Sequence, residues 1–364
     1  MNHDDYLDGP CLLADIGGTN ARFALERGPG RIGDVATLAC DGHPRFVDAV
    51  RAYLRRHPQA RVRHAVVAIA NPIEGDLIRM TNHHWQFSIE EARTDLGLDT
   101  LLLVNDFAAL AMSVPTLAAA ELVQVGGTVN ENAARAGGTI GVLGAGTGLG
   151  VAGLLPAGDT GDAGGWSVLA SEGGHVAFSP ADEREQQILS FCWRRFPHVS
   201  AERLISGPGL SLIHEALSAL RGDALETLTP ALVVERGLAG EALCRETLEI
   251  FCGMLGTMAA NLAVTLNARG GIYIGGGVVP RLGSWFAGSP FRARFEHKGR
   301  FSSFTAQVPC FVIHAPTPAL AGAATMLAQH LGRRSQTEAQ IAPQIAPQIG
   351  SVASLERRTA ALTP

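Results

Sequence analysis

Lysine is almost missing from this chain: Lys298 is the single lysine among 29 lysine and arginine residues. A Walker-type phosphate loop needs a lysine directly after its glycines, so the sequence excludes that class of nucleotide site. Basic residues are also outnumbered by 34 aspartates and glutamates, which gives a net charge of -5. This charge argues against nucleic acid or a membrane surface as a partner.

Cysteine pairs and a hydrophobic leader are missing as well. None of the six cysteines forms a C-x-x-C pair or has zinc-finger spacing with histidine, so we expect reduced, mostly buried thiols in a cytoplasmic protein. Residues 1–10 form an acidic leader without an apolar core, which is unlike a signal peptide. The most apolar window, residues 101–120, contains Asn105, Asp106 and Pro115, so it is a poor membrane span.

The sequence does contain enough apolar material for more than one core. With 364 residues, 46% of them hydrophobic and 17% charged, the composition is typical of soluble globular proteins. A single compact core rarely grows to this length, so we expect two domains.

An amide and a carboxylate follow a strongly apolar, strand-like run. Leu101 to Val104 lead into Asn105 and Asp106, and an apolar, small-residue segment begins at Phe107. A buried strand that ends in this way delivers two polar side chains to the edge of a sheet, where open α/β sheets bind ligands. Both residue types are also preferred helix N-caps, and taken alone the pair favours a cap.

A pair of glycines follows the first strand-like segment. Asp15 precedes Gly17 and Gly18, and Thr19 and Asn20 come next. The pattern fits a hairpin turn whose backbone approaches a ligand closely and whose successive N–H groups bind an anion. A plain Gly-Gly hairpin fits equally well. In the first case Asp15 is the candidate ligand of a Mg²⁺ ion, held through water.

Two further glycine-rich turns lie at Gly144 to Gly150 and at Gly275 to Gly277. The segment from Gly148 to Gly153 formally matches the dinucleotide fingerprint G-x-G-x-x-G. That fingerprint must open a helix, and here Pro156 follows too soon. We therefore predict a second strand–turn–strand hairpin. Two such hairpins, about one domain apart, indicate a duplicated architecture.

Several polar residues allow both a structural and a functional interpretation. Asn82 with Trp85 is suited to contact a sugar. The adjacent histidines between them suggest a metal, but consecutive side chains diverge on a regular element, so we expect surface histidines. Glu172 and His175 are separated by two glycines that leave both side chains uncrowded, although a turn with a surface carboxylate is the simpler interpretation. Glu202 follows a predicted N-cap and fits an ordinary first-turn acid.

The order of these motifs resembles that of bacterial glucokinases in the hexokinase–actin superfamily. Leu13 to Arg22 is similar to their first phosphate motif, Gly144 to Gly150 to the second, and Gly275 to Val278 to the adenosine motif. The resemblance runs in order from Cys11 to Gly332. No Cys/His zinc cluster follows His175, so the non-zinc branch fits better than the repressor–kinase branch. Residues 81–85, 104–107, 172–175, 200–203 and 291–301 also look like glucokinase segments.

The resemblance implies roles for individual residues. Asp106 would be the general base, and Asp15 would hold Mg²⁺ through water. The first two glycine turns would hold the phosphates of ATP, and the third would lie under its adenosine. The implied sugar ligands are Asn82, Asn105, Asp106, Glu172, His175 and Glu202, and the implied ATP-binding residues are Asp15, Gly17, Gly18, Thr19, Asn20, Gly146, Thr147, Gly148, Gly275, Gly276 and Gly277.

The resemblance also implies a two-domain α/β fold of the actin-like ATPase (ribonuclease H-like) class, with a cleft between a small and a large domain. The expected small domain is 11–116, to which 315–332 returns, and the expected large domain is 117–314. From residue 333 the composition shifts, and Ile-Ala-Pro-Gln at 341–344 repeats at 345–348. We therefore expect a disordered tail over residues 333–364.

The expected function is ATP-dependent phosphorylation of glucose at its 6-hydroxyl by a cytoplasmic homodimer. The alternatives are a kinase for another hexose and a non-catalytic, sugar-responsive regulator of the same fold. A regulator could lose Asp106 and would usually gain a DNA-binding segment; Asp106 is present, and no basic helix-turn-helix precedes Cys11. The sequence does not distinguish ATP from polyphosphate as the donor.

Overall fold

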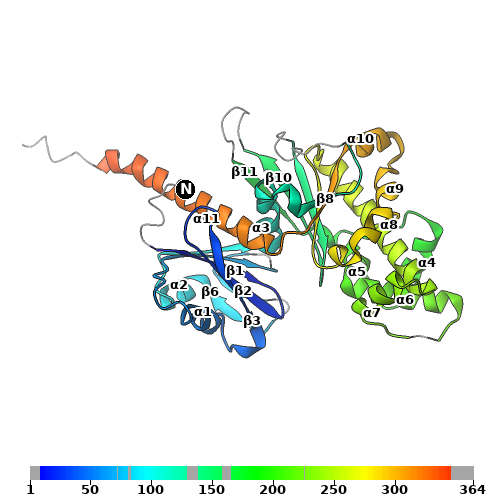
Figure 1. Cartoon of the computed structure of the whole chain (residues 1–364), viewed down its shortest axis with the longest axis horizontal. Coiled ribbons are helices and arrows are strands. Elements are labelled where there is room, and N and C mark those ends of the chain that lie inside the picture. The colour runs from blue at the N-terminus through cyan, green and yellow to red at the C-terminus, as the bar shows by residue number, and fades with distance from the viewer. Residues whose placement is uncertain are drawn as a thin grey trace, which may run out of the picture.

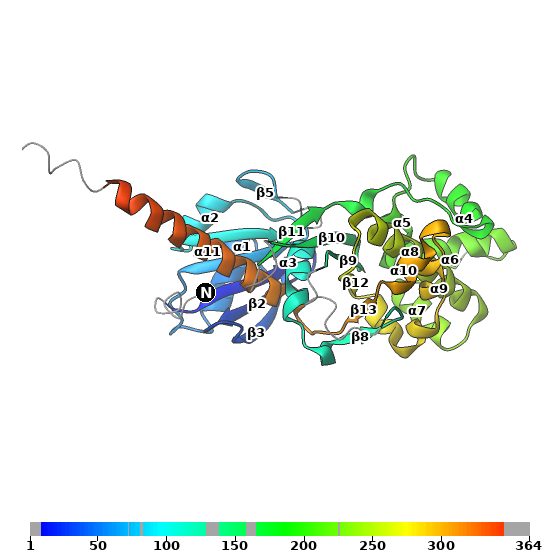
Figure 2. The same cartoon turned by 90° about the horizontal axis from the view of Figure 1, so that it is seen from above.

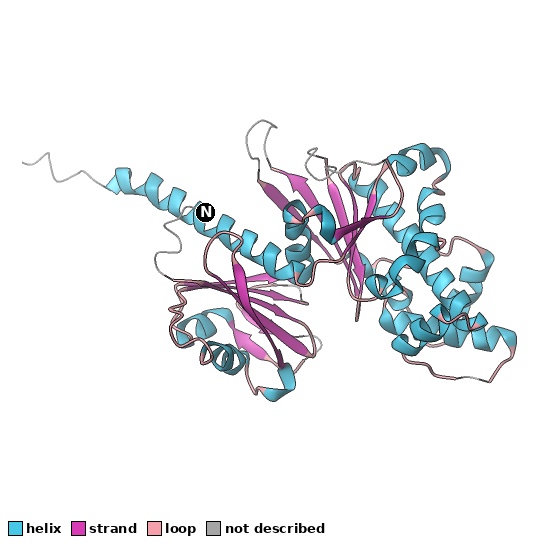
Figure 3. Ribbon diagram, in the orientation of Figure 1, coloured by secondary structure: helices cyan, strands magenta, loops and turns pink. Residues whose placement is uncertain are grey.

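Two β-sheets covered by helices make up most of the chain (Figures 1 and 3). The computed structural model describes residues 9–71, 73–80, 83–128, 138–157, 165–224 and 226–345. A small third sheet pairs β5 (Leu77–Arg79) with β6 (Gln86–Ser88).

The first large sheet has five strands in the order β3-β2-β1-β4-β7. Its strands are β1 (Cys11–Ile16), β2 (Asn20–Glu26), β3 (Ile32–Ala39), β4 (His64–Ile69) and β7 (Thr100–Asn105). β1 pairs antiparallel with β2 and parallel with β4, and β4 pairs parallel with β7. Parallel strands are usually buried on both faces, and β1 and β4 accordingly read as almost continuous apolar runs.

The second large sheet repeats this arrangement. β9 pairs antiparallel with β10 and parallel with β12, as β1 does with β2 and β4. The strand order is β11-β10-β9-β12-β13-β8. Both predicted glycine hairpins and the predicted duplication are thereby confirmed. The strands are β8 (Leu122–Gln124), β9 (Ile140–Ala145), β10 (Leu149–Pro156), β11 (Trp166–Ser171), β12 (Gly271–Gly275) and β13 (Cys310–Ile313).

Two helices, α3 (Asp106–Ser113) and α11 (Pro318–Ile345), connect the sheets (Figure 2). Residues of α11, such as Leu320, are buried against β1 and β4. Residues of α3, such as Leu110, are buried against the second sheet. The two helices touch at Gly322, where a Cβ atom would overlap the carbonyl oxygen of Ala109. This close approach therefore requires glycine and fixes α3 against both layers.

The outer faces of the two sheets are covered by different sets of helices. The first sheet packs on α1 (Phe46–Leu54) and α2 (Ile89–Asp95), whose apolar residues share one core with it. The second packs on α8 (Ala242–Leu266), which is long and apolar enough to cross a membrane, although 72% of its most apolar window is buried. Around α8 lie α4 (Glu183–Trp193), α5 (Ala201–Leu204), α6 (Gly207–Arg221), α7 (Pro230–Leu238), α9 (Phe291–Glu296) and α10 (Ser302–Gln307).

The predicted domain boundaries agree with the observed strands, whereas the predicted start of the tail differs from the observed end of α11. Strands of the first sheet lie within 11–116 and strands of the second within 117–314; the domain limits themselves stay a prediction. Helix α11 continues to Ile345, past residue 333, where we expected a disordered tail to begin; the tail itself stays a prediction. Alanine and glutamine are frequent in this stretch and are good helix formers, so extending an existing helix costs little. Residues 346–364 lie outside the described part of the chain.

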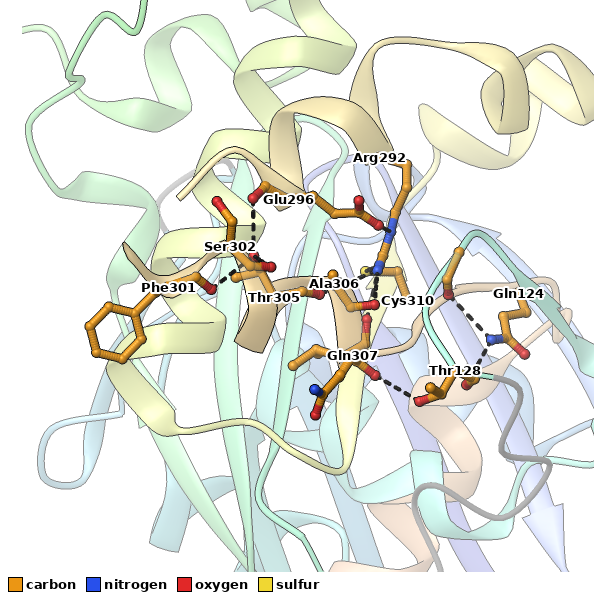
Figure 4. Close-up of polar contacts among 12 residues, drawn as sticks. Gln124, Thr128, Arg292, Glu296, Phe301, Ser302, Thr305, Ala306, Gln307 and Cys310 are labelled. Carbon is orange, nitrogen blue, oxygen red and sulfur yellow. Dashed lines mark hydrogen bonds and ion pairs between the residues drawn. The ribbon is translucent and has the colours of Figure 1, made fainter. Parts of the chain in front are cut away.

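Arg292 joins several elements beside the second sheet (Figure 4). From α9, its guanidinium donates to the carbonyl oxygens of Val308 and Ala306, both at 2.9 Å. Its Nε donates to the carboxylate of Glu296 at 2.6 Å. Only 14% of this side chain is exposed. The planar fork of arginine can serve three acceptors at once, which links α9 to α10 and to the segment that enters β13.

We expect Arg292→Lys to lower the free energy of unfolding by about 2–4 kcal/mol, because a single ammonium group leaves part-buried carbonyl oxygens unpaired. Urea denaturation measures the change. Arg245→Lys is a matched control, since Arg245 also pairs with a glutamate four residues later but is 48% exposed; it should cost less than about 1 kcal/mol. Equal losses in the two variants would contradict the linking role of Arg292.

Candidate active site

β7 ends at Asn105 and α3 begins at Asp106, as the sequence predicts. Asn105 is the N-cap of α3, and its Oδ1 accepts a hydrogen bond from the Ala108 N–H at 3.0 Å. The capping interpretation is therefore correct for Asn105. Oδ1 of Asp106 accepts a hydrogen bond from the adjacent Phe107 N–H at 2.8 Å. This backbone contact helps to orient the carboxylate at the end of the strand.

The first glycine turn lies at the same edge of the sheet. Strand register aligns Ile16 of β1 with Ile69 of β4, and Ile69 with Asn105 of β7. The turn and Asn105 are therefore two strands apart, about 10 Å across the sheet. Within the turn, the Gly17 N–H donates to the carbonyl oxygen of Asn20 at 3.0 Å. The strand register therefore brings the first glycine turn and Asn105 to the same edge of the first sheet.

Two carboxylates at this edge are poorly exposed to water. Burial, with the negative charges of Asp15 and Glu172, raises the pKa of Asp106 to about 7. Burial also raises the pKa of Asp15, and this shift is opposed by Arg22, whose Nη1 lies 3.2 Å from Oδ2 of Asp15. A carboxylate whose pKa is near neutral pH is suited to take a proton in a reaction.

A second group of polar side chains follows β11 and begins α5. His175 lies between two carboxylates: its Nε2 is 4.0 Å from Oε2 of Glu172, and its Nδ1 is 4.0 Å from Oε1 of Glu202. His175 is 62% exposed and Glu172 57%, so the group opens to solvent. The structure thus brings Glu202 of α5 next to Glu172 and His175, which lie three residues apart on one segment. Glu172 is near enough to Asp106 for its negative charge to add a small increase to the pKa of that carboxyl group.

Glu202 also has a structural contact that the sequence did not predict. As expected, it lies in the first turn of α5, with Ser200 as the N-cap. Its Oε2 accepts a hydrogen bond from the Leu149 N–H at 2.9 Å, where β10 begins. A Cβ atom on the neighbouring Gly148 would overlap this carboxylate. Glu202 therefore connects the polar group to the second glycine turn.

The second and third glycine turns are held against each other. The Gly146 N–H donates to the Gly148 carbonyl at 2.8 Å, and the Gly207 N–H at the start of α6 donates to the Gly146 carbonyl at 2.8 Å. Gly276 has a φ of 78°, and a Cβ atom there would overlap the Ala145 backbone. Residues 149–153 lie in β10, which confirms that the G-x-G-x-x-G match is not a dinucleotide site.

A small apolar pocket adjoins the third turn, and sequence reasoning missed it. Its cavity volume is about 110 Å³. The pocket requires α6, α7 and the segment after Gly277 to meet, and no local pattern signals that. The one hint is Pro230, which opens α7. The lining residues are Leu210, Pro230, Ala231, Val234, Val278 and Arg281.

The segment around Trp85 departs from expectation. Asn82 lies outside the described residues. The two histidines are not both surface residues, because only 3% of the His83 side chain is exposed. Their rings also do not diverge: the centroids of His83 and His84 are 4.1 Å apart. The segment is a bend rather than a regular element, so the rule that consecutive side chains point apart does not apply.

Comparison with known proteins agrees with the arrangement of these motifs. The glucokinase family profile matches residues 12–330. A glucokinase of Chromobacterium violaceum is 54% identical over 335 residues, 92% of this chain and 94% of that protein.

This chain belongs to the glucokinase family.

A second relative differs in length. The "Bifunctional protein glk" of Burkholderia thailandensis is 53% identical over 331 residues, 91% of this chain but 50% of that protein. The chain thus spans half the length of that relative. Among solved structures, glucokinase from an Antarctic psychrotroph is 35% identical, with a TM-score of 0.76 and coverage of 88% of this chain and 99% of that chain. These likenesses confirm the predicted glucokinase family and two-domain α/β fold.

The raised pKa of Asp106 predicts a pH-dependent stability. Unfolded aspartate has a pKa of about 3.9, so the folded state holds this proton more tightly. The resulting stability is complete below about pH 4 and is lost as the pH rises through about 7. We expect Asp106→Asn to melt at a higher temperature than wild type at pH 8 and to lose this advantage toward pH 4. A variant that melts below wild type at pH 8 would contradict the assignment.

Proposed function

We propose that this chain is a glucokinase that transfers the γ-phosphoryl group of ATP to the 6-hydroxyl of glucose. The observation that carries the proposal is the carboxylate of Asp106, whose pKa is raised to about 7 by burial, with smaller contributions from the charges of Asp15 and Glu172. Asp15 enters the first glycine turn, whereas Glu172 belongs to the polar group with His175. A proton acceptor thus lies between a candidate phosphate site and a candidate sugar site.

The polar group suits a sugar. Glucose presents a ring of hydroxyls that both donate and accept hydrogen bonds. The carboxylates of Glu172 and Glu202 would accept from these hydroxyls, and the His175 ring would donate or accept according to its tautomer. Oδ1 of Asn105 is engaged by the helix cap, so its Nδ2 amide group would be the donor to the sugar. An analogue that lacks one hydroxyl would leave a polar group unpaired, which favours discrimination. Asn82 stays a proposed ligand.

The glycine turns suit the nucleotide. Gly17 to Asn20 and Gly146 to Gly148 would present backbone N–H groups to the phosphates. The apolar pocket beside Gly275 to Gly277 would take the adenine ring, because flat apolar walls such as Pro230 and Val278 favour it. This arrangement needs no lysine, in agreement with the lysine-poor sequence.

In the proposed reaction, the 6-oxygen of glucose attacks the γ-phosphorus in line with the bond that breaks to ADP. Asp106 takes the proton of the 6-hydroxyl as the new oxygen–phosphorus bond forms, and later releases it to water. Such transfers depend mainly on position and electrostatics. The cap at Asn105 and the packing of α3 supply the position, since they fix the first residue of that helix.

A Mg²⁺ ion, a homodimer and a cytoplasmic location complete the proposal. Asp15 fits the ion: its carboxylate is 20% exposed and only partly neutralised by Arg22, and hard divalent cations prefer such oxygens, often through water. When bound, Mg²⁺ would neutralise phosphate charge.

A coupled assay with glucose, mannose and fructose as acceptors, and with ATP and polyphosphate as donors, tests this function. We expect the highest kcat/KM for glucose with ATP. Preference for another sugar would assign a different hexose kinase. Tight glucose binding without turnover would indicate a regulator that kept the fold.

Asp106→Asn separates the base from a merely structural residue. Asparagine keeps the shape and the contact with the Phe107 N–H but cannot accept the proton. We expect kcat to fall by about 10²–10⁴-fold while glucose still binds. In wild type, kcat/KM should decrease when the pH is lowered through about 7, because the base becomes protonated. Asp99→Asn, at the opposite and exposed end of β7, is the control. A kcat for Asp106→Asn within about three-fold of wild type would sink the assignment.

Gly148→Ala tests the contact between the second turn and Glu202. The new methyl group would overlap Oε2 of Glu202 and displace this carboxylate, so we expect glucose to bind about ten-fold more weakly, an effect of about 1.4 kcal/mol. Gly146→Ala is the matched control in the same turn, because the nearest atom to its Cβ is 4.0 Å away. Calorimetric titration with glucose measures both. Equal affinities in the two variants would remove Glu202 from the sugar site.

A further inference from the structure

Three potential metal ligands meet where α6 passes the beginning of α8. A ring nitrogen of His214, the sulfur of Cys244 and a carboxylate oxygen of Glu241 all lie within 4.8 Å of one another. His214 is on α6, Glu241 is the N-cap of α8, and Cys244 is in its first turn. Cys244 and His214 are buried, whereas Glu241 is exposed.

The polar groups of this cluster are incompletely satisfied. Nδ1 of His214 is buried and has no hydrogen-bond partner among the described residues, and such groups are rare in folded proteins. The side chain of Glu241 makes no capping bond to α8, and one of its oxygens lies within 4.8 Å of the Cys244 sulfur. This imidazole nitrogen is therefore buried beside a thiol and a carboxylate. Because it has no hydrogen-bond partner among the described residues, it is available to bind a ligand.

We propose that His214, Glu241 and Cys244 bind a Zn²⁺ ion. Nitrogen, sulfur and carboxylate oxygen are the donors that zinc accepts, whereas Mg²⁺ and Ca²⁺ prefer oxygen alone. Zinc–ligand bonds of about 2.0–2.3 Å place tetrahedral ligands about 3.5 Å apart, so any pair of ligand atoms near the 4.8 Å limit must move closer on binding. The exposed side of Glu241 leaves the fourth position to water.

The charges and protons balance when Zn²⁺ binds. Zn²⁺ displaces the thiol proton of Cys244 to solvent, and the resulting thiolate and the Glu241 carboxylate neutralise the ion. Burial and the nearby Glu241 carboxylate raise the pKa of the Cys244 thiol to about 11, so the bound ion itself must drive the loss of this proton. Glu241 also lies 3.9 Å from Nη1 of Arg236. Both side chains are substantially exposed, so exchanging this weak pair for a metal bond costs little.

The position of the site indicates a structural role. Leu210, one turn before His214 on α6, lines the apolar pocket, and Gly207 at the start of α6 contacts the second glycine turn. A metal between α6 and α8 would fix this helix, and with it one wall of the pocket. The ion itself would lie away from Asp106, so the site is independent of the proposed reaction.

A second cluster, formed by Asp41, His83 and His84, has similar spacing but is a weaker metal site. Nδ1 of His83 accepts from the Trp85 N–H at 3.3 Å. The other nitrogen, Nε2, is also buried without a hydrogen-bond partner among the described residues, but in a neutral imidazole it then carries the proton and cannot bind a metal. This cluster therefore serves as an internal control.

Zinc titration of the full-length, metal-stripped protein against a chromophoric chelator tests the proposal. We expect one tightly bound Zn²⁺ per chain and a higher melting temperature with zinc. With Co²⁺ as the probe, a thiolate-to-cobalt charge-transfer band should appear. Cys244→Ser and His214→Gln should each weaken zinc binding at least about 100-fold, since even losses in the outer shell of a zinc site cost 10–100-fold. Cys244→Ser should also abolish the band.

Two matched variants control for general damage. Cys252→Ser changes a thiol that is equally buried in the same helix, and His84→Gln changes the competing cluster; both should keep the bound zinc and the band. The proposal is overturned if wild type does not compete with the chelator for zinc. It is also overturned if Cys244→Ser binds zinc as wild type does, or if His84→Gln loses the ion.

Discussion

The charge on Asp106 is the constraint on which this site depends. Burial at the end of β7 disfavours its ionised form, and the nearby Asp15 adds repulsion. Weaker effects favour ionisation: the hydrogen bonds from the backbone N–H groups of Phe107 and of Asp106 itself, and the position at the first residue of α3, where the helix dipole favours a negative charge. Greater exposure to water would lower the pKa of Asp106 toward that of an ordinary aspartate, which is a weak base. A less polar environment would raise the pKa further and keep the carboxyl group protonated. The pKa of about 7 reflects this balance.

The position of Asp106 relative to the second sheet depends on α3. The ring of Phe107 packs so closely on β10 that a Cβ atom at Gly150 would overlap it. Farther along the helix, Ala109 meets Gly322 of α11, which is itself buried against the first sheet. The residue that begins α3 is thus held between both layers. A change in how the sheets are packed would move the carboxylate, which links the fold directly to the chemistry.

Local features of the site could be predicted from the sequence, because they depend on neighbouring residues. The hairpins, the end of β7 and the first-turn position of Glu202 are of this kind. For Asn105 and Glu202 the structural and functional interpretations proved compatible: Asn105 caps α3 and keeps its amide free, and Glu202 has one oxygen on the Leu149 N–H and the other toward His175. At both positions one side chain serves the helix and still offers a polar atom to the site.

Contacts between distant segments could not be predicted. The His83 side chain is buried because Trp85 and the segment at Asp41 close around it. The apolar pocket requires Leu210, Pro230 and Val278 from three separate segments. The length of α11 follows from its docking on the first sheet, which starts a helix that the next residues extend. In each case tertiary packing decides a structure on which the local pattern is silent or misleading.

The duplicated fold explains why a carboxylate precedes the glycine turn of the first sheet but not that of the second sheet. β1 and β9 have six residues each and are followed by three-residue turns, so Asp15 corresponds to Gly144. Asp15 faces Ala68 of β4, where there is room for a carboxylate and its Arg22 partner. Gly144 instead faces Gly275, and a Cβ atom there would overlap the backbone of the third glycine turn. A carboxylate in the second repeat would exclude that turn. The close backbone packing proposed to support adenosine and the charge proposed to support Mg²⁺ therefore cannot occupy the same repeat, which assigns them to opposite sheets.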